Sequence, residues 1–152
     1  MKQAVEISIA CENDIPALCI LLEILLSQEL EFKPNVEAQR RGLLRIIKDP
    51  NTGFILVAKV NDLTIGMVNI LWSVSTALGE RVAILEDMVV SADYQGSGVG
   101  SQLIEVAIKE AKKQSCKRIT LLTDASNEIA QMFYQKHGFT QSTMVPFRLS
   151  LD

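Results

Sequence analysis

The chain has 152 residues, close to the commonest length of a single domain, so we expect one domain over residues 1–152. Apolar residues make up 48% of the chain and charged residues 22%, a globular composition that excludes wholesale disorder. The formal net charge of −3 gives no reason to expect a nucleic-acid partner, because phosphate binding draws on clustered Lys and Arg.

The sequence also favours a protein without a membrane partner. Residues 1–14 mix acidic side chains into what a secretory signal would need as an apolar core. The most apolar stretch, Ile15–Leu26, carries Pro16 and Glu23 and is shorter than a membrane span. The cysteines are odd in number and form no CxxC pair, which favours free thiols over a disulfide framework or a zinc site. We expect a cytoplasmic protein without a metal.

Two periodicities divide the chain into predicted elements. Alternation with period two predicts strands, and apolar residues three and four apart predict helices. From the N-terminus we expect a strand at Val5–Ile9, helices at Ile15–Ser27 and Val36–Lys48, and a hairpin of Phe54–Val60 and Thr64–Trp72 around Asn61-Asp62. A polar loop at Ser73–Arg81 then precedes a strand at Val82–Val90, a helix at Gly98–Ser115, a strand at Arg118–Thr123, a helix at Asn127–Lys136, and strands at Thr140–Ser142 and Val145–Leu149.

This order of elements predicts an α/β fold. Hairpins and crossovers both occur in it, so the central sheet should be mixed and flanked by helices.

A glycine-rich loop follows the strand that ends at Val90. It reads Gln95-Gly96-Ser97-Gly98-Val99-Gly100 and leads directly into a helix. Glycines let the backbone approach a bulky anion, and the first N–H groups of a helix have no intrahelical partners. With the helix dipole, these donors form a phosphate site. The loop alone leaves open a tight turn without a ligand.

Two nucleotide motifs fail on spacing in this loop. A P-loop closes on Gly-Lys-Ser/Thr, whereas Gly100 is followed by Ser101-Gln102. A dinucleotide fingerprint needs its third glycine three places after the second, and positions 101 and 103 are serine and leucine.

The spacing does match Q/R-x-x-G-x-G/A, carried here by Gln95, Gly98 and Gly100, which resembles the acetyl-CoA motif of the Gcn5-related N-acetyltransferase family. Downstream, Asn127–Phe139 is similar to that family's N-x-x-A-x-x-F-Y-x-K-x-G-F signature. The resemblance covers essentially the whole chain. It implies an N-acetyltransferase that moves the acetyl group of acetyl-CoA to an amine in a ternary complex.

The resemblance also implies where the cofactor lies. The strand ending at Val90 should carry a bulge and splay from its sheet neighbour, so that the pantetheine arm runs along backbone in the opened wedge. The implied cofactor contacts are Met88, Val89, Val90, Gln95, Gly96, Ser97, Gly98, Val99, Gly100, Asn127 and Tyr134. Gln95 stands where arginine is commoner in the family, and we expect a mild effect because most phosphate contacts come from backbone.

Two side chains are the expected catalytic groups. Tyr134 matches the family's general acid for the departing thiolate, with a core aromatic as the alternative. Glu86 is the expected base, acting through a water, because the Glu-Asp-apolar-Val run resembles glucosamine-6-phosphate acetyltransferases. A structural carboxylate is the alternative for Glu86. Alternation should send Glu86 and Asp87 to opposite faces of the strand. Asp124 is a second candidate base.

The sequence does not identify the acceptor. The resemblance places its pocket near residues 29–35 and 72–79, with Phe32, Trp72, Ser75 and Asp124 as expected contacts. A small-molecule amine and a protein amino group both remain open. The rival interpretation is a non-catalytic acyl-CoA-binding or sensing module. A homodimer is common among relatives.

Overall fold

The structure is a computed structural model and describes residues 4–29 and 33–152. Contacts group the chain into two compact units, residues 1–122 and 123–152, and each is described by itself. Within the described residues, no helix combines the length and apolar character needed to cross a bilayer.

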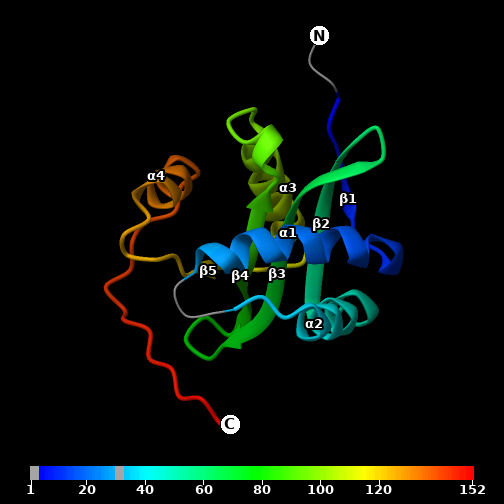
Figure 1. Ribbon diagram of the computed structural model, residues 1–152. Helices are drawn as coiled ribbons and strands as arrows, with labels where there is room; N and C mark the ends of the chain where they lie inside the picture. Colours follow the sequence, from blue (N-terminus) through cyan, green and yellow to red (C-terminus); the bar gives the residue numbers. More distant parts are fainter. Residues whose placement is uncertain (1–3, 30–32) are drawn as a thin grey trace. The chain divides into compact units, whose positions relative to one another are not determined.

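The first unit contains a five-stranded sheet in the order β1-β2-β3-β4-β5 (Figure 1). Neighbouring strands from β1 to β4 pair antiparallel, and β4 pairs parallel with β5, so the predicted mixed sheet is confirmed. The strands are β1 (Glu6–Ile9), β2 (Gly53–Val60), β3 (Leu63–Ser75), β4 (Glu80–Val90) and β5 (Ile119–Leu121).

Three helices cover the two faces of this sheet. They are α1 (Ile15–Gln28), α2 (Val36–Lys48) and α3 (Val99–Lys113), and two 3₁₀ turns lie at Glu12–Asp14 and Ala92–Tyr94. Helices α1 and α2 share one core with the face of β3 that carries Met67. On the opposite face, a Cβ added at Gly66 would lie 3.0 Å from Leu103 of α3, so α3 packs against the backbone of β3. In Figure 1, α1 crosses in front of the sheet.

Local signals in the sequence explain where the elements begin. Asn35 Oδ1 accepts from the Ala38 N–H at 3.2 Å, so α2 begins at Val36 as predicted. Asn61 and Asp62 have φ angles of 49° and 66°, which suit a two-residue turn between paired antiparallel strands. The predicted hairpin is therefore confirmed.

The predicted loop at Ser73–Arg81 is wrong, because most of it belongs to strands. β3 continues to Ser75 and β4 begins at Glu80, which leaves a short loop at residues 76–79. The guanidinium of Arg81 lies 4.7 Å from the centre of the Trp72 ring. This cation–π contact supports the two strands where their sequence is polar.

The second unit contains α4 (Glu128–Lys136), which is followed by Gly138 in a left-handed conformation (φ 94°) that is typical after a helix end. The predicted strands at Thr140–Ser142 and Val145–Leu149 are wrong, since residues 139–152 contain no strand. A strand needs a neighbour for its hydrogen bonds, and alternation in the sequence does not supply one. Phe147, in this segment, is 95% exposed.

Candidate active site

Strand β4 carries a β-bulge, as the family resemblance implies for this strand. The ladder with β3 pairs Leu85 with Ile70 and Asp87 with Asn69, so Glu86 is an extra residue between two successive pairs. Leu85 and Asp87 consequently face opposite sides of the sheet, as Ile70 and Asn69 do. The extra residue interrupts the period-two alternation of side chains along β4. Our expectation that Glu86 and Asp87 face opposite sides of the sheet is based on that alternation.

The two acidic residues of the bulge have different surroundings. The side chain of Glu86 is exposed, whereas Asp87 is partly buried. Asn69 Nδ2 donates to Asp87 Oδ2 at 2.9 Å, and both residues lie on the sheet face that α1 covers. Burial raises the pKa of Asp87, the hydrogen bond from Asn69 opposes that rise, and the charge of Glu86 adds to it.

Asn69 was not among the predicted site residues. It is 3% exposed, and its Oδ1 has no hydrogen-bond partner among the described residues. The signal for it in the sequence is a single polar residue inside the apolar run of residues 65–71. A buried amide oxygen without a donor is uncommon in folded proteins.

The bulge lies beside the end of the ladder between β4 and β5. Their parallel ladder pairs Ala83 with Ile119 and ends at Leu85 with Leu121, while β4 continues to Val90 along β3. The observed strand β5 is thus shorter than the predicted Arg118–Thr123. The resemblance implies a wedge between these strands, and the part of β4 beyond the ladder is where that wedge would lie.

The glycine-rich loop connects β4 to α3. Gly96 and Gly98 have φ angles of 79° and 90°, which L-residues rarely adopt, and a Cβ at either position would meet nothing within 4 Å. Backbone conformation, not lack of space, therefore requires these glycines. Gly98 is the N-cap of α3, and no side chain caps this helix end. The first turn of α3 thus offers backbone N–H groups to an anion.

The other side chains of the loop bind its own backbone. Gln95 Nε2 donates to the Val90 carbonyl at 3.1 Å, and Ser97 Oγ donates to the Tyr94 carbonyl. The Gln95 contact holds the loop against the end of β4, and the Ser97 contact ties the loop to the 3₁₀ turn at Ala92–Tyr94. The Gln95 side chain is thereby engaged within the protein, so the donors that remain for a phosphate in this loop are mainly backbone groups.

The second unit carries three of the predicted residues. Asn127 Oδ1 accepts from the Ala130 N–H at 3.1 Å and caps α4. The carbonyl of Asp124 accepts from the Asn127 N–H at 2.9 Å in the turn before that helix. Tyr134 lies within α4 and packs edge-on against Phe133 and Phe139. Burial raises the pKa of Tyr134 to about 12, so its hydroxyl stays protonated at working pH.

The predicted acceptor contacts are dispersed. Phe32 lies outside the described residues. Ser75 is 8% exposed, and its Oγ accepts from the Leu78 N–H at 3.1 Å, which closes the β3–β4 loop. Trp72 stacks against Phe54, with ring centres 5.4 Å apart. By alternation along β3, Trp72 faces the side of the sheet opposite Asn69.

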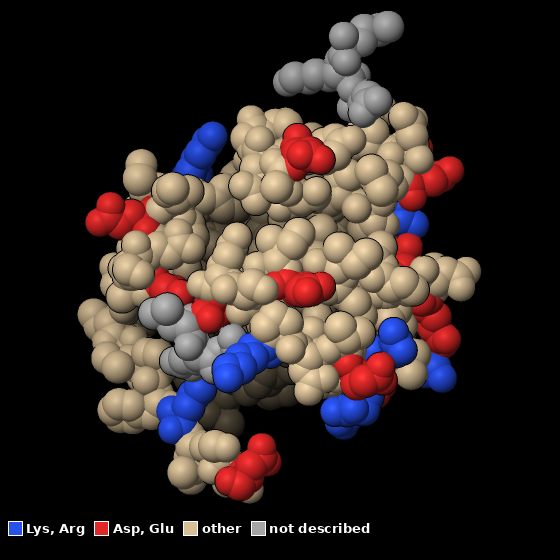
Figure 2. All heavy atoms as spheres, viewed as in Figure 1, with Lys and Arg blue, Asp and Glu red and all other residues tan. Residues whose placement is uncertain are grey.

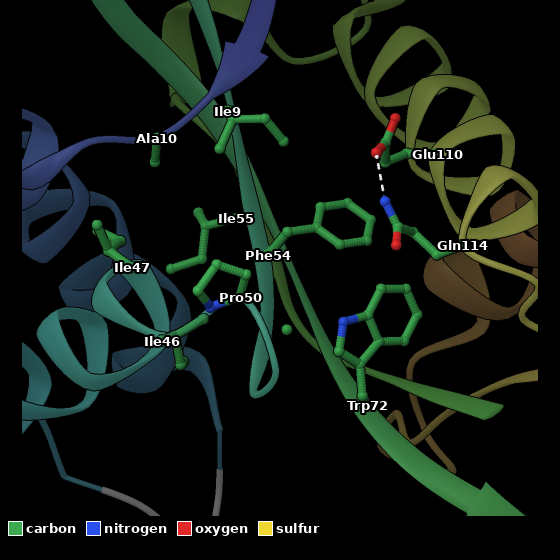
Figure 3. Close-up of a pocket in the computed structure, with 11 residues that line it drawn as sticks. Ile9, Ala10, Ile46, Ile47, Pro50, Phe54, Ile55, Trp72, Glu110 and Gln114 are labelled. Atoms are coloured by element: carbon green, nitrogen blue, oxygen red, sulfur yellow. Dashed lines mark hydrogen bonds between the residues drawn. The ribbon is translucent and has the colours of Figure 1, made fainter. Parts of the chain in front are cut away.

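Trp72 also lines a cavity of about 210 Å³ (Figure 3). Its walls are mostly apolar side chains of β1, β2 and α2, and Glu110 of α3 and Gln114, the C-cap of that helix, form its polar side. Gln114 Nε2 donates to Glu110 Oε1 at 3.3 Å. Glu110 lies twelve positions after Gly98, which corresponds to a rise of about 18 Å along α3. The cavity is therefore distinct from the glycine-rich loop.

The fold and the loop agree with one protein family. The profile of the acetyltransferase (GNAT) family matches residues 20–139, and the chain belongs to that family. Its relatives include the aminoalkylphosphonate N-acetyltransferase of Salmonella typhimurium, 26% identical over 90% of this chain and 86% of that enzyme. The protein is accordingly an N-acetyltransferase.

Two further relatives describe the range of the family. The [Ribosomal protein bS18]-alanine N-acetyltransferase of Escherichia coli is 36% identical over 41% of this chain and 42% of that enzyme. The solved structure of aminoglycoside N-acetyltransferase AAC(6')-Iy in complex with CoA matches with a TM-score of 0.83, at 18% identity over 100% of this chain and 98% of that one. The structural match concerns the fold.

Proposed function

We propose that the protein transfers the acetyl group of acetyl-CoA to the primary amine of a small molecule, by direct attack in a ternary complex. The observation that carries this proposal is the loop with left-handed Gly96 and Gly98 at the start of α3. It directly follows a bulged strand that extends beyond its parallel partner. The whole chain of 152 residues then forms one N-acetyltransferase domain.

The residues present fit CoA. Backbone N–H groups of residues 95–100 would hold its pyrophosphate at the positive end of α3. Backbone of Met88, Val89 and Val90 would hold the pantetheine arm, because β4 extends there past the end of its ladder with β5. Asn127 contributes by capping α4, the helix that carries Tyr134. When bound, acetyl-CoA supplies an activated acetyl thioester.

Three groups of the chain serve the transfer. The N–H of Val90 stabilises negative charge on the acetyl oxygen, since a fixed backbone donor needs no reorganisation. Glu86, exposed at the bulge, takes a proton from the acceptor through a water. Tyr134, protonated at working pH, gives a proton to the departing thiolate. Asp124 remains the second candidate base.

The acceptor is proposed to be a small molecule. The relative that covers 90% of this chain is named for aminoalkylphosphonates, whereas the enzyme named for a ribosomal protein matches only 41%. The surface around α1 is compatible with a cationic amine as acceptor. Figure 2 shows that the middle of this surface is largely uncharged and that its acidic side chains lie singly. Helix α1 itself contains Glu23 and no Lys or Arg.

An acceptor screen tests this function. Purified protein is mixed with acetyl-CoA and, separately, with an aminoalkylphosphonate, an amino sugar, a polyamine, and a peptide with a free N-terminus. Free thiol is measured against reactions that lack the amine. We expect thiol release with at least one small amine and an N-acetylated product by mass spectrometry. CoA binding without release for any acceptor would support a sensing module instead.

A further inference from the structure

The cavity at the C-terminal end of α3 has a chemistry that acetyl transfer does not use. Its volume is about 210 Å³, which is well above the space that one water needs and below the roughly 300 Å³ of pockets for drug-sized ligands. A small organic molecule fits these limits. Glu110, in its wall, lies about 18 Å along α3 from Gly98. A ligand here would therefore not occupy the proposed pyrophosphate site.

Two aromatic side chains form one wall of the cavity. The rings of Phe54 on β2 and Trp72 on β3 have centres 5.4 Å apart and planes inclined at 50° (Figure 3). Both side chains are partly exposed. Aromatic rings attract cations, and Trp72 already does so, because the Arg81 guanidinium lies 4.7 Å from its ring centre. Arg81 does not line the cavity, which leaves this wall to a ligand.

The cavity also contains a carboxyl group. Among the described residues that line it, Glu110 is the one acidic or basic residue, and it is partly buried. None of the ion pairs in residues 4–29 and 33–152 includes Glu110. Gln114 Nε2 donates to Glu110 Oε1 at 3.3 Å and thereby orients the carboxylate. The aromatic wall and this carboxylate both favour a positively charged ligand.

The remaining walls decide which kind of cation fits. They are formed by apolar residues, among them Ile46, Pro50 and Ile55. A primary ammonium group carries three N–H donors, and each needs an acceptor when it leaves water. Side-chain acceptors among the described lining residues are limited to Glu110 and Gln114. A quaternary ammonium group has no N–H, and its methyl groups can contact apolar side chains while its charge remains.

We propose that this cavity binds a small quaternary ammonium compound. Its trimethylammonium head lies against Phe54, Trp72 and Glu110, and its short apolar body lies along Ile46 and Ile55. A quaternary nitrogen has no lone pair and cannot take up an acetyl group, so this ligand is not the acceptor of the transfer. The inference is independent of the proposed function, because it uses none of the residues proposed to bind CoA or to act in catalysis.

Titration of the wild type with butyltrimethylammonium and with butylammonium tests the class of ligand. Trp72 is the single tryptophan of the chain, so its fluorescence reports on this cavity. We expect the quaternary ion to bind with a dissociation constant about tenfold lower than that of the primary ion. Saturating CoA should leave this constant unchanged. No binding of the quaternary ion, equal affinity for the two ions, or loss of binding in the presence of CoA would overturn the inference.

Two variants test the groups that recognise the charge. Glu110→Gln keeps the size of the side chain and removes its charge, and Glu105→Gln is the matched control on the same helix, outside the cavity. Calorimetry should show butyltrimethylammonium binding about fivefold more weakly to Glu110→Gln and unchanged to Glu105→Gln. Trp72→Leu should weaken binding about tenfold. If Trp72→Leu does not fold, Glu110→Gln decides, because wild-type affinity in that variant would overturn the inference.

Discussion

Asn69 Nδ2 and Asp87 Oδ2 lie 2.9 Å apart across strands β3 and β4, at the pair where β4 gains one residue. The hydrogen bond links a buried amide to a partly buried carboxylate on the face that α1 covers. The bulge and the acidic pair are thus a single structural feature. It places one carboxylate inside the protein and the other, Glu86, at the surface.

The stability of Asp87→Asn should depend on pH in a defined way. Burial, the main cause, raises the pKa of Asp87 above its ordinary value of 3.8, so the folded state holds this proton more tightly than the unfolded state. Ionisation of Asp87 therefore destabilises the wild type as pH rises through that window. We expect the variant to be more stable than wild type at pH 7. Its Tm should rise by about 3 °C for each kcal/mol of unfavourable free energy that is removed with the carboxylate charge.

Urea unfolding at several pH values checks this prediction. The advantage of the variant should shrink as pH falls through the raised folded pKa and then through 3.8, and below that pH the wild-type carboxyl is protonated in both states. The new amide can also donate to Asn69 Oδ1, which has no partner within the described part of the chain. A variant less stable than wild type at pH 7 would contradict this interpretation.

Asp14 should show the opposite pH dependence. Its burial acts to raise its pKa, but hydrogen bonds from Lys59 Nζ at 2.7 Å and the Cys11 N–H at 2.8 Å outweigh that effect and lower the pKa below 3.8. The stabilisation is then present above pH 3.8 and is lost as pH falls through the folded pKa. We expect Asp14→Asn to lower the free energy of unfolding by about 2 kcal/mol at pH 7.

Glu12→Gln is the matched control for Asp14→Asn. Glu12 lies 3.9 Å from Lys48, and both side chains are mostly exposed. An exposed pair of this kind contributes about 0.5 kcal/mol or less. Denaturant curves in which the two variants lose equal stability would contradict the importance of the Asp14–Lys59 contact.

Glu86→Gln tests the proposed base. We expect kcat/KM to fall about 100-fold at pH 7, the lower end for a lost general base, because most of an alkylamine is protonated there. Raising the pH should partly rescue the variant, since more acceptor arrives neutral. Glu105→Gln, an exposed acid on α3, is the control. Wild-type activity of Glu86→Gln across the pH range would contradict its role as the base and leave Asp124 as the candidate.

Tyr134→Phe tests the proposed acid. The ring and its contacts with Phe133 and Phe139 remain, so the fold should persist. Loss of the hydroxyl should lower kcat about 100-fold and leave CoA affinity nearly unchanged, as for an interaction made only in the transition state. Tyr94→Phe, at the other tyrosine of the chain, should retain most activity. Full turnover in Tyr134→Phe would contradict the role of Tyr134 as the acid and would indicate that its ring serves only in packing.

Much of the fold could be predicted because its signals are local. Helix α2 begins at its Asn35 cap and ends at Lys48, as expected, and the turn at Asn61-Asp62 joins the predicted hairpin. The glycines in residues 95–100 predicted a loop that leads directly into a helix, and the family resemblance predicted the bulge.

Other features depend on contacts that sequence patterns do not contain. The extra residue at Glu86 is defined by its ladder with β3, so the surroundings of Glu86 and Asp87 could not be derived from alternation. Asn69 belongs to no motif, and its role depends on which residue lies opposite. The strand predicted at Val145–Leu149 failed for a similar reason, because a strand exists only beside a partner.

The most direct test of acetyl-CoA use is calorimetric titration of CoA into Gly98→Asp and Gly98→Asn. Both residues tolerate left-handed backbone better than other L-residues, and a Cβ at this position meets nothing within 4 Å, so strain and fit are matched. Only the aspartate adds negative charge at the proposed pyrophosphate site. We predict that Gly98→Asn retains measurable CoA binding and that Gly98→Asp loses it at low salt. Equal CoA affinity in the two variants would contradict phosphate binding at this loop.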